Sequence, residues 1–378
     1  MTKLSDLTDD LVGEILSRVT LTSLIAVRST CKLWNALSKK LILGKRAESR
    51  KQQFLEFIKI SSRVCSMKFD RKGIRNEEEE FIDPSTKQVS VFDGIRVSQI
   101  FCCDGLLLCV PMEEDDSITR VIVWNPYLGQ IRWIEPRTKF GRYDGFALGF
   151  DNNGNHKILR SVYERGICID DVYDFSTDSW RVLDISPDSK ELCFSNGVSL
   201  KGNAYLFDEE LTTVETEEAD TVEVDYLVCF DFTTERFGPR LSLPFHPPYP
   251  SIETLTLSSV RDEKLSVLYQ HGNTFDIVEI WVTTKIEPNV VSWSKFLRVD
   301  MSLINGLPDD FKARCFFSDE EKKVAVVFNG DPYRKTKTIA CIIGEDGYFK
   351  SVNGEEAANP WDYGPHVCSS YVPSLVQL

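Results

Sequence analysis

The sequence has no run of 18 apolar residues, which excludes a membrane-spanning helix. We therefore expect no membrane partner. Its eleven cysteines form no CxxC pair, and its four histidines have no metal-binding spacing. These histidines are His156, His246, His271 and His366. The motifs GxSxG, GxGxxG and GxxxxGK[ST] are also missing. We therefore expect no catalytic residue, no cofactor and no metal, and so no enzyme.

The composition is that of a folded protein, with 378 residues, 42% hydrophobic and 11% aromatic. This length suffices for a large core. The first residues, MTKLSDLTDD, lack the apolar stretch of a signal peptide, and the cysteines are scattered through apolar segments. We expect mostly buried thiols in a reducing compartment, the cytoplasm or the nucleus.

Residues 7 to 40 have a helical apolar period. Thr8 suits an N-cap, and Asp9 and Asp10 put negative charge in the first turn, where the helix dipole favours it. Apolar side chains then recur in three short stretches. These are Leu11, Val12, Ile15, Leu16 and Val19, then Leu24, Ile25 and Val27, then Leu33, Trp34, Leu37 and Leu41. Three helices this short share too few large side chains to bury every stripe, so we expect a partner surface to cover them.

Two other interpretations of this segment are an N-terminal cap packed on its own domain and a helix-turn-helix that binds DNA. Residues 1–53 contain ten Lys or Arg and five Asp or Glu, a net charge of +5. The whole chain carries -14, so the remainder carries -19 and would repel a nucleic acid. Charge therefore disfavours a nucleic-acid partner.

From about residue 54 onward, short apolar runs are separated by turn residues, which is typical of an all-β protein. Three segments share one pattern: VIVWNPYLGQIRWIEP, DVYDFSTDSWRVLD and LVCFDFTTERFGPRLSLP. Each has a strand that ends in an aromatic residue, then Asn or Asp, a polar turn and a second strand. Asn125, Asp174 and Asp231 stand at the first position of these turns. Asn and Asp suit this position because their side chains bond their own backbone two residues on. Looser copies are EIWVTTKIEPNVVSWSKFLRVD and TIACIIGEDGYFKSV.

A period near 50 residues indicates propeller blades, with a two-sheet sandwich as the alternative. Residues 90–378 hold about five blades. FLEFIKI, VCSMKF and the C-terminal PSLVQL could complete a sixth by pairing the first and last strands. The fold class is therefore mostly β, with three N-terminal helices and a kelch-like β-propeller of about five to six blades. Residues 151–155 should form a hairpin turn, since the EF-hand positions for Gly and Glu hold His156 and Val162.

The N-terminal segment resembles an F-box, most specifically in EILSRV and RSTCKLWN. The usual prolines are replaced by Thr8 and Thr20, and Gly13 lies inside the first helix. The resemblance implies binding to a Skp-type adaptor, and through it to a cullin. The implied adaptor-binding residues are Leu7, Leu11, Ile15, Leu16, Val19, Leu24, Cys31 and Trp34.

The remainder resembles the F-box-associated domain of a large plant family, in strings such as CDGLLLCV, VWNPYLGQIRWI, GFDNNGNHKIL and CFDFTTERFGP. The resemblances imply an F-box at 1–45, a linker and first strands at 46–89, and a propeller-like domain at 90–378. They also imply a substrate-recognition subunit of a Skp–cullin–F-box ubiquitin ligase, with an unknown client on the propeller. The alternatives are a scaffold with a degenerate F-box and a propeller enzyme. The acidic runs at 77–80, 113–116 and 209–225 should be solvated loops, or could select a basic client.

Overall fold

The computed structural model describes part of the N-terminal segment and most of the remainder. The described residues are Leu11, Val12, Ile15 and Trp34, then 53–60, 62–70, 74, 85–112, 120–138, 141, 144–164, 167–183, 197–213, 221–245, 254–261, 263–270, 277–304, 311–329, 340–352, 366–368 and 371–378. Leu11, Val12, Ile15 and Trp34 are helical. The rest of the three predicted helices lies outside the described residues.

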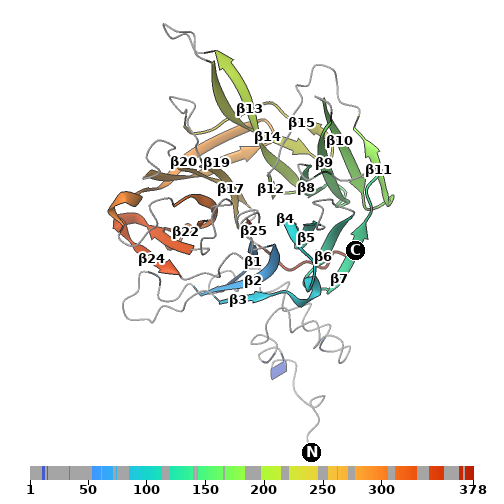
Figure 1. Cartoon of the computed structure of the whole chain (residues 1–378), viewed down its shortest axis with the longest axis horizontal. Coiled ribbons are helices and arrows are strands. Elements are labelled where there is room, and N and C mark those ends of the chain that lie inside the picture. The colour runs from blue at the N-terminus through green and yellow to red at the C-terminus, as the bar shows by residue number, and fades with distance from the viewer. Residues whose placement is uncertain are drawn as a thin grey trace, which may run out of the picture.

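The described strands form six antiparallel sheets arranged as blades around an axis (Figure 1). Blade 1 contains β1 (Gln53–Ile60), β2 (Arg63–Asp70), β3 (Ser85–Gln88) and β25 (His366–Cys368). Blade 2 contains β4 (Val97–Cys103), β5 (Leu106–Pro111), β6 (Val121–Asn125) and β7 (Gln130–Ile134). Blade 3 contains β8 (Gly145–Phe150), β9 (His156–Glu164), β10 (Ile167–Asp174) and β11 (Ser179–Val182).

Blade 4 contains β12 (Gly197–Leu200), β13 (Asn203–Thr213), β14 (Thr221–Asp231), β15 (Arg236–Phe237) and β16 (Leu241–Ser242). Blade 5 contains β17 (Thr254–Val260), β18 (Lys264–Gln270), β19 (Ile277–Glu287) and β20 (Val290–Asp300). Blade 6 contains β21 (Ala313–Asp319), β22 (Val324–Asn329), β23 (Ala340–Gly344) and β24 (Phe349–Val352). Short 3-10 helices are η3 (Ser90–Phe92), η4 (Met301–Leu303) and η5 (Glu345–Gly347).

The predicted propeller is confirmed, and the described strands give it six blades. The innermost strands contact one another in the order β25, β4, β8, β12, β17, β21 and back to β25, so the ring is closed. The ring closes within blade 1, where β25 near the C-terminus pairs with β1, and Cys368 lies opposite Phe57. A closed ring removes the exposed sheet edges that a linear array of blades would leave at its ends.

The closing strand differs from the one predicted. β1 and β2 are the predicted runs FLEFIKI and VCSMKF, but their partner is His366–Cys368 and PSLVQL forms no strand. PSLVQL instead crosses blade 2, because its main chain is hydrogen-bonded to Asn125 and to Gln130. We call residues 371–378 the C-terminal strap.

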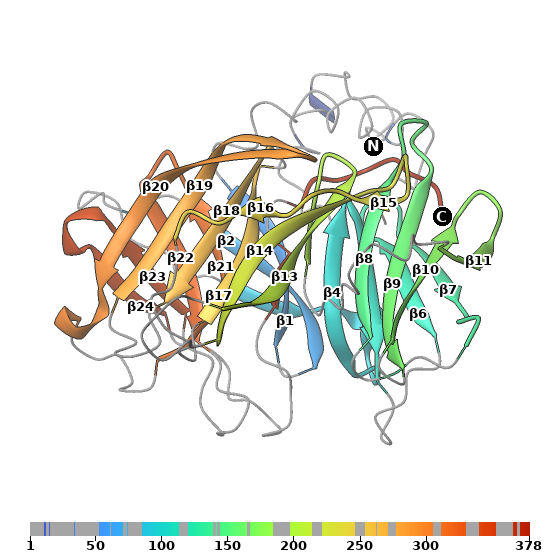
Figure 2. The same cartoon turned by 90° about the horizontal axis from the view of Figure 1, so that it is seen from above.

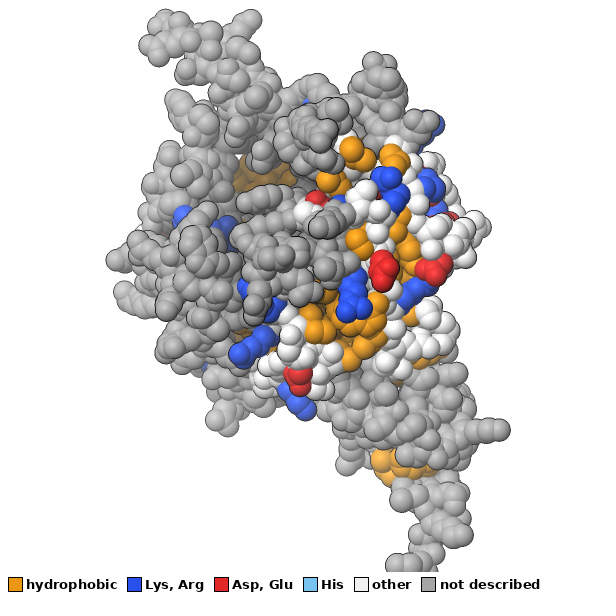
Figure 3. Space-filling view, turned by 45° about the vertical axis from the view of Figure 1, so that its right-hand side comes forward, with side chains coloured by type: hydrophobic (Ala, Val, Ile, Leu, Met, Phe, Trp, Pro, Cys, Tyr) orange, Lys and Arg blue, Asp and Glu red, His pale blue; other side chains and the backbone are white. Residues whose placement is uncertain are grey.

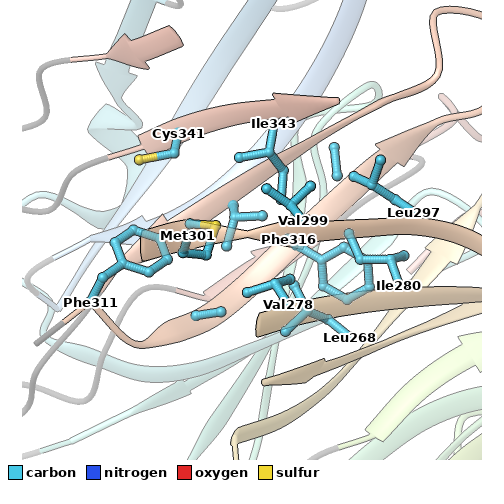
Figure 4. Packing of buried hydrophobic residues seen from close by; sticks show 13 residues of the cluster. Leu268, Val278, Ile280, Leu297, Val299, Met301, Phe311, Phe316, Cys341 and Ile343 are labelled. Atoms are coloured by element: carbon cyan, nitrogen blue, oxygen red, sulfur yellow. The ribbon is translucent and has the colours of Figure 1, made fainter. Parts of the chain in front are cut away.

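Each blade is apolar on both faces because a neighbour covers each side. Successive residues of β5 point to opposite faces: Leu106 and Leu108 pack toward blade 3, whereas Leu107 and Cys109 pack toward blade 1. All six residues of β5 are therefore buried, which explains its continuous apolar run. Each of the six hydrophobic clusters fills one interface between neighbouring blades. Figure 4 shows the cluster between blades 5 and 6, where Ile280 and Phe316 lie among other apolar side chains.

The repeat found in the sequence corresponds to the third and fourth strands of blades 2 to 6. As predicted, Asn125, Asp174 and Asp231 open the turns between these strands. The side-chain oxygens of all three accept backbone N–H groups two residues further on. Residues 151–155 form the predicted turn between β8 and β9.

The described cysteines are mostly buried, as expected. Eight are free thiols; seven of these are buried, and Cys102 is partly exposed. Cys168 differs from the expectation because it is disulfide-bonded.

Candidate functional site

The two faces of the propeller differ in their connections. Successive strands of a blade are antiparallel, so the connections between first and second strands and between third and fourth strands lie on one face. In blades 2 to 6 these connections span two to five residues, and we call this side the turn face. The connections between second and third strands, and those between blades, lie on the opposite face. We call that side the loop face.

The chain enters the propeller at the turn face. Gln53 begins β1, the second strand of blade 1, and β25 ends beside it because the two strands are antiparallel. The strap follows β25 along the same face, and Figure 2 shows it in dark red beside the ends of the strands. The N-terminal segment is therefore attached to the face opposite the loop face.

Most of the longer connections lie on the loop face, although the β2–β3 connection of blade 1, residues 71–84, lies on the turn face. In blades 2, 4, 5 and 6 the connections between second and third strands span six to ten residues. Residues 112–120 contain four acidic and one basic residue, and residues 214–220 contain four acidic residues. Residues 330–339 contain three basic and one acidic residue. Charged loops on a rigid scaffold are a common basis of protein recognition.

The N-terminal helix presents apolar side chains to solvent. Leu11 is 49% exposed and Ile15 is 40% exposed, although both are large aliphatic residues. They are four positions apart in a helix, so they lie on the same side of it. Val12, by contrast, is completely buried. One side of this helix is thus covered, and another side leaves a stripe that a partner could cover.

The predicted adaptor-binding residues are only partly described. Leu11 and Ile15 are exposed, and Trp34 is partly buried. Leu7, Leu16, Val19, Leu24 and Cys31 lie outside the described residues. Their role therefore stays a prediction.

A buried ion network lies in blade 3, and the sequence interpretation did not find it. Arg160 on β9 is 1% exposed, and its guanidinium contacts Asp144 at 2.7 Å and Asp171 at 3.4 Å. Arg137 reaches Asp171 from the outside at 3.0 Å. Burial raises the pKa of the Asp144 carboxyl, although the nearby Arg160 charge opposes this. We assign this network a structural role, because both carboxylates are already paired with arginine.

The described residues offer no metal site and no membrane helix. No group of three His, Cys, Asp or Glu side chains within them could hold a metal ion. His156 belongs to blade 3, whereas His366 belongs to the closing strand of blade 1. Burial lowers the pKa of His366 to about 4, so this imidazole is neutral at pH 7. No described helix is long and apolar enough to cross a membrane.

Comparison with protein families gives two matches that together span most of the chain. A model described as the F-box domain matches residues 4–46. A model described as the F-box associated beta propeller domain matches residues 55–378. The second match begins two positions after the start of β1 and includes all six blades.

Two similar curated proteins come from Arabidopsis thaliana. "F-box protein At3g49510" is 57% identical over 396 residues, with 100% of both chains covered. "F-box/kelch-repeat protein At3g13680" is 52% identical over 393 residues, covering 100% of this chain and 97% of the relative.

Among solved structures, TolB from Acinetobacter baumannii matches with a TM-score of 0.44 and 12% identity, covering 88% of this chain and 72% of that one. A likeness at this level carries no argument about function.

Proposed function

We propose that this chain, which belongs to the plant F-box proteins with an F-box-associated β-propeller domain, is the substrate-recognition subunit of a Skp–cullin–F-box ubiquitin ligase. The N-terminal helices bind a Skp-type adaptor, and the propeller binds a client protein. The chain contributes no catalytic residue. Its mechanism is positional, because holding the client beside a charged enzyme raises the effective concentration of the reacting groups.

The exposed stripe of Leu11 and Ile15 is the observation that carries this proposal. Two large aliphatic side chains in water on one side of a helix are expected where a partner completes the core. Residues 4–46, which match the F-box model, include both side chains.

The position of the N-terminal segment supports a division of labour between the two faces. The segment joins the propeller at the turn face, where the connections within blades 2 to 6 are short. An adaptor bound to it leaves the long, charged connections of the loop face for the client. We therefore place client binding on the loop face.

A binding experiment with a purified Skp-type adaptor tests the proposal. Leu16→Asp introduces a charge into the predicted interface, and an unpaired buried charge costs several kcal/mol, so adaptor binding should vanish. Leu303→Asp is the matched control, because Leu303 is 78% exposed on η4 of the propeller. The control should bind the adaptor like the native chain, and circular dichroism should show both variants folded.

Two results would count against the proposal. If Leu16→Asp binds the adaptor normally, the docking surface has been wrongly assigned. If the folded native chain does not bind any Skp-type adaptor, the chain is better described as an adaptor-independent scaffold, and Thr8 and Thr20 in place of prolines would be the first cause to examine.

A further inference from the structure

The outer strand of blade 2 is unusually apolar on its open side. Ile131 and Trp133 on β7 are 37% and 43% exposed, and their side chains point the same way because they are two positions apart. Among the described residues of the other outer strands, β11 and β20 each have one large exposed apolar side chain, and β3, β15 and β24 have none. Natural edge strands usually carry charged or polar side chains that discourage pairing.

The exposure arises because blade 1 is too polar at its rim to cover blade 2. Ile131 lies opposite Trp124, and Trp133 lies opposite Ile122, so all four share one face of the sheet. Ile122 and Trp124 are buried against blade 1, in the cluster that includes Phe57. The outer strand of blade 1 is β3, whose residues Ser, Thr, Lys and Gln are all exposed. The apolar row of blade 2 therefore continues past the apolar part of its neighbour.

Arg120 adds an open hydrogen-bonding group to this surface. Its guanidinium carbon lies 4.4 Å from the centre of the Trp133 ring, a cation–π contact. No described residue gives this guanidinium a carboxylate partner or gives the indole N–H of Trp133 an acceptor. Arg120 is the last residue before β6, so it stands at the loop face. Figure 3 shows this side of the molecule, where hydrophobic side chains lie uncovered among Lys and Arg side chains.

We propose that Arg120, Ile131 and Trp133, here named the β7 rim, bind an extended segment of the client that presents a large apolar side chain next to a carboxylate. The apolar side chain packs on Ile131 and Trp133, and the carboxylate accepts from the guanidinium of Arg120. Trp and Arg are the residues most often found at the energetic centre of protein interfaces. An edge strand also offers main-chain groups to an extended partner. This inference rests on the proposed function, since it names the client's chemistry.

The acidic residues that precede Arg120 in the sequence limit which client segments could bind the β7 rim. Four acidic residues at 113–116 precede Arg120 by at most seven positions. A run of four acidic residues so close to Arg120 in the sequence disfavours a long acidic run in the partner, because like charges repel. A single carboxylate beside an apolar residue satisfies both conditions.

Selection of short random peptides displayed on phage, panned on the full chain, tests the inference. The Trp133→Ser variant serves for counter-selection. We expect enrichment of peptides with a large apolar residue next to one Asp or Glu. The best peptide, labelled and measured by fluorescence anisotropy, should lose at least about tenfold in affinity on Trp133→Ser. The native chain should bind this peptide more tightly than a version with Lys in place of the acidic residue. The Arg120→Ser variant should bind the two peptides equally. Val182→Ser, which alters an exposed apolar residue on β11, should leave the affinity unchanged.

Other outcomes overturn the inference. Enrichment of basic peptides, no enrichment, or full affinity in Trp133→Ser would each do so. Sedimentation of the free chain provides a further check: a dimer that Trp133→Ser converts to a monomer would make the rim a contact between copies. Adaptor binding by the same preparation separates this inference from the proposed function. A chain that discriminates the peptides but binds no adaptor keeps the peptide site and loses the ligase role.

Discussion

The side-chain amide of Asn125 donates a hydrogen bond to the carbonyl oxygen of Val376, 2.8 Å away and 251 positions further along the chain. The same amide nitrogen donates to the carbonyl oxygen of Ser374 at 3.2 Å. The side-chain oxygen of Asn125 accepts from the backbone N–H groups of Tyr127 and Leu128. One buried side chain therefore fixes its own turn and holds the C-terminal strap on blade 2.

Replacing Asn125 should lower the free energy of unfolding more than replacing Asp231, its counterpart in blade 4. Asn125→Ala removes four hydrogen bonds at a site with no solvent exposure, and we expect a loss of about 3 kcal/mol in the free energy of unfolding. Asp231→Ala removes turn bonds only, with an expected loss of about 1 kcal/mol. Urea denaturation of the full chain measures both. Equal losses would show that the bonds to the strap contribute little.

Deletion of the strap should destabilise the propeller. Tyr371 is 8% exposed and packs edge-on against Phe57 at 4.8 Å between ring centres. Val376 and Leu378 pack on the cluster between blades 2 and 3. Removing residues 371–378 should lower the thermal midpoint by roughly 10 °C or more, or yield insoluble protein. Removing Gln377 and Leu378 alone keeps both carbonyl acceptors of Asn125 and should lower it less. A truncated chain that melts like the full chain would contradict a structural role for the strap.

Restoring the two prolines should strengthen adaptor binding. Thr8 and Thr20 stand where F-boxes usually carry proline, and proline at a compatible position reduces the conformational freedom lost on ordering. We expect the double variant Thr8→Pro and Thr20→Pro to bind a Skp-type adaptor several-fold more tightly, as measured by isothermal titration calorimetry. An unchanged affinity would show that both departures from the family pattern are harmless.

The blades could be predicted from the sequence because their signal is local. Asn125, Asp174 and Asp231 each bond the backbone of their own turn, so the same residue types recur at the same place in blades 2, 3 and 4. The alternation of buried residues on β5 follows from strand geometry alone.

The remaining features depend on contacts between distant parts of the chain. The closing strand, His366–Cys368, has three residues and no distinctive pattern, and it is a strand because β1 leaves its edge open. The ion network of Arg160 joins side chains from β9, β10 and the start of blade 3. Trp133 is exposed because β3 has no apolar side chain to cover it, and no pattern within β7 could reveal this.

Asp170 should make the propeller less stable as the pH rises from about 4 to 6. Its side chain is buried at 3% exposure on β10, and one carboxyl oxygen has no hydrogen-bond partner. Burial raises the pKa of this carboxyl to about 6, from 3.8 in an unfolded chain, and the nearby Asp171 charge adds to the effect. The folded state therefore binds the proton more tightly than the unfolded state. The stabilisation is complete below pH 4 and is lost as the pH rises through 6, at a cost of about 3 kcal/mol.

Asp170→Asn removes this titration while keeping the shape of the side chain. At pH 4.5 only part of the cost of ionising Asp170 is present. The free energies of unfolding of the variant and the native chain should therefore differ much less there than at pH 8. By pH 8 the variant should be more stable by about 3 kcal/mol, because its amide never has to ionise. Urea denaturation of both proteins across this range gives the difference directly, and groups that titrate equally in both cancel from it. Curves that run parallel from pH 4.5 to 8 would mean that Asp170 ionises as easily in the folded chain as in the unfolded one.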